Sequence, residues 1–246
     1  MPFPTITATA RSVIAREVEE AIVPIENSLQ GSVTDTLDVL IHDEGLLIRH
    51  ELNLPIVHNL MGNPSTPLSR VLRVYSHPQA LGQCGAFLAR ELPQAELAAA
   101  LSTAGSVEQA MLDPIPSLAI APKRAAEIYG AQIIRHGIQD DDNNVTRFVV
   151  LSTSDAERTG NDKTSVAFAF HEDRPGQLFK VMELFATAGI NLTKIESRPT
   201  RTGLGRYHFL ADLEGHRDDS TVAKVLSSTQ SLVSEFKMFG SYPRFG

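Results

Sequence analysis

Hydroxyl and amide side chains follow several predicted strands, at the points where those strands end. Asn27 and Ser28 come after the strand predicted at 21–25, and Ser76 follows the one at 71–75. In an open α/β sheet, ligands bind beyond the carboxyl ends of strands, where helix N-termini present free N–H groups and a partial positive charge. A set rich in hydroxyls and amides and poor in carboxylates suits a small anion held by neutral donors. The full set is Glu26, Asn27, Ser28, Ser76, Gln83, Ser102, Thr103, Thr146 and Arg147.

Each of these residues also has a purely structural explanation. Gln83 lies seven residues after Ser76, about two helical turns, which would place both on one face. Ser76 and Ser106, however, are typical helix caps. Asn27 and Ser28 are equally typical of turns. The pattern alone therefore predicts a small-anion site and nothing sharper.

The elements that must position these residues follow a repeating theme from Val13 to Leu151. A short β-branched run ends in small polar residues and an amphipathic helix follows, which is typical of α/β organisation. Pro55 predicts that the extended segment 46–58 is an edge or crossover. Ser76 looks like an N-cap, and Gly130 is the expected helix stop. The expected strands are 21–25, 71–75, 96–101, 117–121, 131–138 and 145–151, and the expected helices are 32–42, one from Pro78 through Leu88, one from about Ser106, and 122–129.

A change of composition marks a domain boundary. The segment 152–163, STSDAERTGNDK, is polar and has no hydrophobic period, so we interpret it as a linker. The residues from 164 to 246 then predict a βαββαβ order, which is the ferredoxin-like layout. Its expected elements are strand 165–170, helix 176–188, strands 190–198 and 205–213, helix 218–227 and strand 232–240.

The bulk composition excludes several classes of protein. The 246 residues, 42% of them hydrophobic, are enough for two domains. Cys84, the single cysteine, can form no internal disulfide, and we expect it in the core. No Cys/His cluster has zinc-ligand spacing, and the scattered His42, His50, His58 and His77 are expected to have surface or structural roles.

The net charge and the N-terminal sequence limit the classes of partner that the protein is expected to bind. A net charge of -7 without a basic stripe gives no footprint for nucleic acid. Neither a signal peptide nor an apolar stretch long enough to span a bilayer is visible. We therefore expect a cytoplasmic protein with a small-molecule partner and no membrane association.

Five motifs occur in order along the chain. They are VPIENSLQGSVTDTLDVL at 23–40, YSHPQALGQC at 75–84, LSTAGS at 101–106, NNVTRFVVL at 143–151 and RPGQLFKVMELFATAGINLTKIESRPT at 174–200. Together they resemble the prephenate dehydratases, with a C-terminal ACT domain. The resemblance implies a periplasmic-binding-protein-like, two-lobed catalytic domain at 1–151, the linker at 152–163 and an ACT regulatory domain at 164–246.

The resemblance also implies a reaction and roles for residues. The reaction is loss of carbon dioxide and hydroxide from prephenate to give phenylpyruvate in phenylalanine biosynthesis, a carbon-oxygen lyase activity that needs no metal or organic cofactor. Thr146 matches the family's catalytic threonine and is assigned to the leaving hydroxyl. The residues assigned to substrate orientation and charge stabilisation are Asn27, Ser76 and Gln83, with Ser28, Thr103, Arg147 and Phe148 as further substrate-binding candidates.

The ACT domain is expected to bind L-phenylalanine and to control the enzyme allosterically. The expected effector residues are Gly176, Gln177, Leu178, Asn191, Leu192, Glu196, Ser197 and Arg198. Gln177 stands where the family commonly has Ala, which could alter effector affinity or selectivity. ACT domains usually pair edge to edge, so a homo-oligomer is expected, either a dimer or a tetramer.

The family normally begins with a strand, a Gly-Pro-x-Gly-Thr turn and a helix, which this chain lacks. TITATARSVIAREVEEAI already corresponds to the approach to the VPIENS strand. We therefore expect an N-terminally shortened form with a weakened first lobe and poor catalysis. Three other functions remain open: a solute-binding module, a catalytically impaired phenylalanine sensor, and an arogenate dehydratase.

Overall fold

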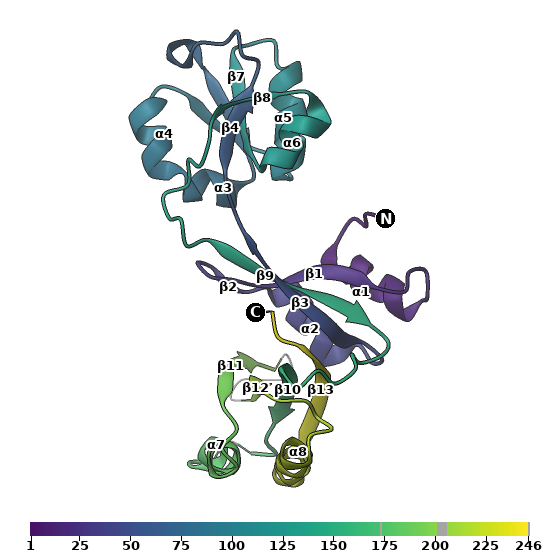
Figure 1. The fold of residues 1–246 in the computed structure, drawn as a ribbon. Helices are drawn as coiled ribbons and strands as arrows, with labels where there is room; N and C mark the ends of the chain where they lie inside the picture. Colours follow the sequence, from purple (N-terminus) through teal and green to yellow (C-terminus); the bar gives the residue numbers. More distant parts are fainter. Residues whose placement is uncertain (173, 201–205, 246) are drawn as a thin grey trace. The chain divides into compact units, whose positions relative to one another are not determined.

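The computed structural model describes residues 1–172, 174–200 and 206–245. Its chain divides into two compact units (Figure 1), the first made of Met1–Leu54 and Thr146–Gly246 and the second of Pro55–Val145. The chain therefore enters and leaves the second unit in the middle of the first.

The first unit opens with the amino-terminal sheet, whose strand order is β2-β1-β9-β3. β1 and β9 pair antiparallel in a register that sets Asn27 opposite Thr146. β3 lies at the edge, as its Pro55 predicted. The elements are α1 (Ile6–Ile14), β1 (Ala21–Asn27), β2 (Gly31–Ser32), α2 (Thr34–His42), β3 (Leu47–Pro55) and β9 (Val145–Ser152).

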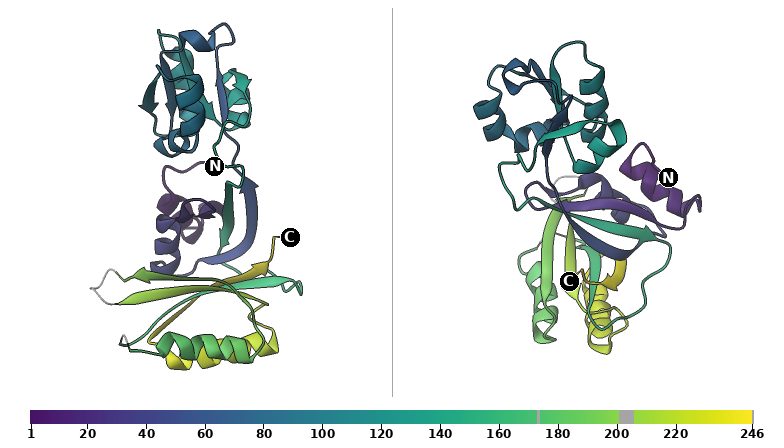
Figure 2. Two further views of the ribbon diagram at one scale, coloured as in Figure 1. Left: turned by 90° about the vertical axis from the view of Figure 1, so that its left-hand side faces the viewer. Right: turned by 45° about the horizontal axis from the view of Figure 1, so that its top comes forward.

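The carboxy-terminal sheet completes the first unit and confirms the predicted βαββαβ order. Its strands are antiparallel in the order β11-β12-β10-β13. Helices α7 and α8 cover one of its faces (Figure 2, left). The elements are β10 (Asp162–Ala169), α7 (Gln177–Thr187), β11 (Leu192–Pro199), β12 (Tyr207–Glu214), α8 (Ser220–Leu232) and β13 (Glu235–Pro243); the predicted start of the third strand, Gly205, lies outside the described residues.

The other face of the carboxy-terminal sheet shares a hydrophobic core with the amino-terminal sheet. Leu210, Phe239 and Tyr242 from the former pack in one cluster with Ile48 and Val149 from the latter. At this seam Gly240 has a φ of +135°, and a Cβ there would lie 2.4 Å from the carbonyl oxygen of Ile48. Only glycine allows the two backbones to approach this closely.

The second unit is a five-stranded sheet in the order β6-β5-β7-β4-β8. β5 is parallel to β6 and β7, whereas β4 is antiparallel to β7 and β8. The elements are β4 (Asn59–Gly62), a 3-10 turn (Leu68–Arg70), β5 (Arg73–Ser76), α3 (Pro78–Gln83), α4 (Gly85–Glu91), β6 (Glu96–Ala99), α5 (Thr103–Leu112), β7 (Ser117–Ala121), α6 (Lys123–Tyr129) and β8 (Gln132–Arg135).

Local predictions in the second unit were partly wrong. The cap of α3 is His77, whose ring accepts from the backbone N–H of Gln79 at 3.3 Å, and not Ser76. The single helix expected from Pro78 is interrupted at Cys84 and forms α3 and α4. The helix expected from about Ser106 begins at Thr103, because the Ser102 side chain accepts a hydrogen bond from the N–H of Gly105 and caps it there.

Other expectations were confirmed or need smaller corrections. Gly130 ends α6 in the left-handed conformation, and the strand at 117–121 forms as predicted. Helix 32–42 begins later, at Thr34, because Gly31 and Ser32 form β2. Cys84 is fully buried in a core cluster, and burial raises the pKa of its thiol to about 12. Among the described residues, no helix has both the length and the apolar character needed to cross a membrane.

Candidate active site

Asn27 and Thr146 form a buried hydrogen-bonded pair at the end of β1. The Nδ2 of Asn27 donates to the Oγ1 of Thr146 at 2.9 Å, and both residues are less than a tenth exposed. The Oδ1 of Asn27 accepts from the backbone N–H groups of Leu29 and Gln30, each at 3.1 Å. Asn27 is therefore a turn residue as well as the partner of Thr146. Because the Thr146 oxygen accepts from Asn27, its own hydrogen is directed at another acceptor.

Arg147, the next residue on β9, has its guanidinium bound to the carboxy-terminal sheet. Its Nε donates to Glu51 at 2.7 Å, its Nη1 to Asp212 at 2.7 Å and its Nη2 to the Tyr242 hydroxyl at 2.8 Å. Successive side chains on a strand point to opposite faces, so Arg147 points away from the face that carries Thr146. The expected substrate-binding residue is thus held by other protein groups.

The protonation of this cluster follows from burial and charge. Burial alone would lower the pKa of Arg147, but Tyr242, Asp212 and Glu51 raise it above its ordinary value. The pKa of the fully buried Tyr242 is raised well above its usual range by burial and then by Asp212. Arg147 is therefore permanently cationic and Tyr242 permanently neutral at physiological pH. Ser165 completes the network with bonds of 2.6 Å to Asp212 and to Tyr242.

The remaining catalytic candidates lie in the second unit. The fully buried Ser76 hydroxyl donates to the carbonyl of Ile120 at 2.7 Å. Gln83, the last residue of α3, accepts at its Oε1 from Asn144 at 3.0 Å and contacts the ring of His58 at 2.8 Å. Among the further candidates, Ser28 is exposed and Phe148 is partly exposed, both in the first unit. Thr103 is the first residue of α5 in the second unit.

The expected effector residues divide into two groups. Gly176, with a φ of +84°, precedes α7 directly, and Gln177 is the first residue of that helix. Glu196 and Arg198 instead contact the amino-terminal half of the first unit. The Ser32 hydroxyl donates to Glu196 at 2.5 Å, and Arg198 donates to Asp38 of α2 at 2.7 Å.

Strand alternation explains that division. Residues 194, 196 and 198 of β11 are partly buried, whereas Ser197 between them is exposed, as is Asn191 just before the strand. Lys194, which was not predicted as a site residue, donates to Ser32 at 2.8 Å and lies 3.2 Å from Glu26. The charge alternation Lys-x-Glu-x-Arg is the sequence signal that could have indicated this contact.

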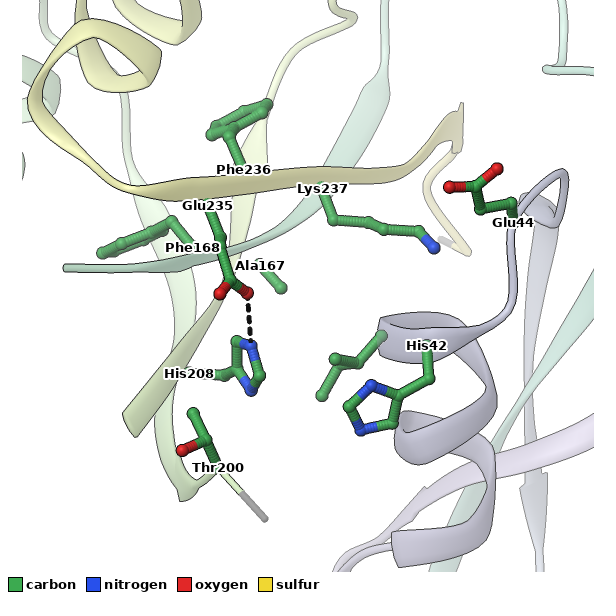
Figure 3. Close-up of a pocket in the computed structure, with 10 residues that line it drawn as sticks. His42, Glu44, Ala167, Phe168, Thr200, His208, Glu235, Phe236 and Lys237 are labelled. Carbon is green, nitrogen blue, oxygen red and sulfur yellow. Dashed lines mark hydrogen bonds and ion pairs between the residues drawn. The ribbon is translucent and has the colours of Figure 1, made fainter. Parts of the chain in front are cut away.

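A cavity of about 450 Å³ lies in the first unit between the end of α2 and the carboxy-terminal sheet (Figure 3). His208 contacts Glu235 at 3.1 Å, and Lys237 donates to the carbonyl of Asp43 at 2.8 Å. The pKa of Lys237 is lowered by burial. None of the site residues predicted from the sequence lines this cavity. No group of three or more His, Cys, Asp or Glu residues that could hold a metal occurs in the parts of the chain that the structure describes.

Fold and site together define a two-lobed α/β protein with a hydroxyl-amide site and a C-terminal ferredoxin-like module. Residues 1–156 match the family model described as prephenate dehydratase, and residues 165–229 match that of the ACT domain. The chain therefore belongs to the prephenate dehydratase family.

Individual relatives cover almost the whole chain. A prephenate dehydratase of Bacillus subtilis is 34% identical over 99% of this chain and 89% of its own length. A bifunctional chorismate mutase/prephenate dehydratase of Aquifex aeolicus is 38% identical over 99% of this chain, which spans 66% of that longer protein.

Two solved structures are similar in fold. A prephenate dehydratase from Arthrobacter aurescens in complex with L-Phe has a TM-score of 0.90 and 39% identity, covering 99% of this chain and 81% of that one. GqqA, described as a novel type of quorum quenching acylase, has a TM-score of 0.85 and 29% identity, covering 100% and 89%.

Proposed function

We propose that this chain converts prephenate to phenylpyruvate, carbon dioxide and hydroxide. The observation that carries the proposal is the hydrogen bond that joins Asn27, in the VPIENS segment, to Thr146, in the Thr-Arg-Phe segment. As the C–CO₂ bond breaks, its electron pair enters the ring, the C–OH bond breaks, and the ring becomes aromatic. Thr146 keeps its proton and donates a hydrogen bond from its hydroxyl to the departing hydroxyl group, where negative charge develops, so the group leaves as hydroxide. The bond from Asn27 fixes the direction of that hydrogen, so the donor is oriented before the reaction begins.

The other assigned residues bind and orient the substrate. Prephenate is a dianion, and the amide N–H₂ of Gln83 is a neutral donor that suits its carboxylates. The hydroxyl hydrogen of Ser76 is used by the carbonyl of Ile120, so we propose that Ser76 orients this part of the site and does not donate to the substrate. Ser28, Thr103 and Phe148 are proposed as further substrate contacts. We assign no direct substrate contact to Arg147, because its guanidinium is occupied by Glu51, Asp212 and Tyr242.

We further propose that L-phenylalanine binds the C-terminal domain and controls the reaction. The L-Phe complex of the Arthrobacter protein supports this assignment. Gly176, Gln177, Leu178, Asn191, Leu192 and Ser197 are the proposed effector contacts. Glu196 and Arg198 would transmit the binding event, since they contact Ser32 and Asp38. A cytoplasmic homo-oligomer, either a dimer or a tetramer, completes the proposal.

The test is replacement of Thr146 by valine, which removes the hydroxyl at nearly constant volume. We expect kcat with prephenate to fall about 100- to 1,000-fold, the usual effect of losing one preorganised donor. Thr146→Ser should retain more activity, and Thr187→Val, at an exposed helix position, should change nothing. Parental turnover by Thr146→Val would show that the assignment is wrong. Parallel assays with arogenate decide between the two substrates.

A further inference from the structure

His58 and Gln83 form a buried contact in the second unit. The Nε2 of His58 lies 2.8 Å from the Oε1 of Gln83, and His58 is only 3% exposed. Asn144, 1% exposed, donates its Nδ2 to the same Oε1 at 3.0 Å. Since a carboxamide oxygen only accepts, the Nε2 of His58 must carry its hydrogen. Two donors thus hold one end of the Gln83 side chain.

The opposite end of the Gln83 carboxamide has no acceptor. Among the described residues, neither the buried Nε2 of Gln83 nor the buried Nδ1 of His58 has a hydrogen-bond partner. Unsatisfied buried polar atoms are rare in proteins and call for an explanation such as a ligand. A buried N–H₂ group with a fixed direction is suited to a carboxylate or hydroxyl oxygen.

The backbone around this contact holds both residues in place. The N–H of His58 donates to Gln139 at 3.0 Å, and its carbonyl accepts from Ile138 at 2.9 Å. The carbonyl of Gln83 accepts from the N–H of Asp140 at 2.8 Å. The segment 138–140 therefore ties His58 and the end of α3 to each other. The main chain at both residues is therefore fixed, and the ring contact with Gln83 fixes the imidazole relative to it.

We propose that His58 is a positioning residue for the reaction: it fixes the Gln83 carboxamide so that its Nε2 is presented to an oxygen of the anionic substrate. The inference rests on the proposed function. His58 itself contacts no substrate and acts through Gln83.

A double-mutant cycle of His58→Met and Gln83→Met tests this role. His58→Met should lower kcat/KM for prephenate about 100-fold, the scale expected when a catalytic group is misplaced. In the Gln83→Met background the same change should cost less than about twofold, because the two residues act as one unit. His58→Gln, which keeps a donor near the Nε2 position, should stay within about threefold of the parent. The matched control is His136→Met, at an exposed histidine of the same unit.

The outcomes separate this inference from the proposed function. Equal losses from His58→Met with and without Gln83, or parental activity of His58→Met, would overturn it. A merely structural role predicts that the loss of kcat/KM persists in the Gln83→Met background and that His58→Gln loses as much activity as His58→Met. If the parental chain does not turn over prephenate, the proposed function fails, and the same cycle on the prephenate dissociation constant, measured by melting shift, still decides the role of His58.

Discussion

Replacing Asp212 by asparagine should both destabilise the first unit and disconnect its effector domain from Thr146. Asp212 lies on β12, and its Oδ2 accepts from Arg147 at 2.7 Å. Asparagine keeps the shape, but an amide nitrogen cannot accept a hydrogen bond, and the negative charge is lost. Arg147 is permanently cationic, so the cluster gains an unbalanced buried charge.

The expected size follows from the burial of the pair. The side chains of Arg147 and Asp212 are 12% and 11% exposed. Removing one partner of a buried ion pair costs about 3–5 kcal/mol. Glu51 still holds the Nε of Arg147 at 2.7 Å, which favours the lower end. For a chain of this size, about 3 kcal/mol corresponds to a fall in Tm of about 6–12 °C.

The effect on regulation is measured in the same variant. Arg147 follows Thr146 directly on β9, so its anchorage to β12 and β13 provides a physical link from the effector domain to the Thr146 hydroxyl, the proposed catalytic group. Allosteric coupling typically changes affinity by about 5- to 150-fold. In Asp212→Asn, the change that L-phenylalanine produces in kcat/KM should be less than about twofold. Phenylalanine should still bind, and a melting shift measures that.

The matched control is Asp218→Asn in the same domain. The Asp218 side chain is 73% exposed, so its charge is worth little and both Tm and regulation should stay at the parental values. A Tm of Asp212→Asn within about 2 °C of the parent, with an unchanged phenylalanine response, would refute the reasoning.

Two further predictions concern the rest of the chain. Gly240→Ala should lower the free energy of unfolding by about 3 kcal/mol or more, because its Cβ would meet the Ile48 backbone, whereas Gly82→Ala, where nothing lies within 4 Å, should be neutral or stabilising in the same urea titration. The hydrogen bond from Tyr75 lowers the pKa of Asp113 to about 2, so this carboxylate stabilises the folded state fully above its unfolded pKa and loses that effect as the pH falls from about 4 towards 2. Asp113→Asn should therefore flatten the decline of Tm over that range, and an identical decline in both proteins would contradict the assignment.

The fold was largely predictable because its signals are local. Hydrophobic periodicity located the strand at 117–121, whose five residues are all buried, and the βαββαβ order of the C-terminal half. Gly130 marked the end of its helix because the left-handed backbone conformation that often ends a helix favours glycine. The role of Ser76 was not predictable in this way. Its hydroxyl bonds to Ile120 on a neighbouring strand, and a local cap signal cannot indicate so distant a partner.

For the candidate site, contacts between residues that belong to the motifs could be anticipated from the sequence, and contacts with residues outside the motifs could not. Motif spacing selected Asn27 and Thr146, which lie 2.9 Å apart in the structure. The binding of Arg147 to Asp212 depends on residues 65 positions away with no shared pattern. His58 was likewise expected to be structural, because nothing in its neighbourhood indicates the contact with Gln83.

The insertion of the second unit between β3 and β9 has a consequence for folding on the ribosome. Thr146 is 119 residues beyond Asn27, so the strand that joins β1 to β3 is made only after the whole second unit has been synthesised. At about 5–20 residues per second, the amino-terminal strands wait roughly 6–24 s without their central neighbour. The second unit has a sheet and a core of its own, so all its residues are available before the amino-terminal sheet can be completed. The Asn27–Thr146 contact thus forms only after the second unit has been made, and until then the strand edges of β1 and β3 lack their central partner and are open to wrong pairing.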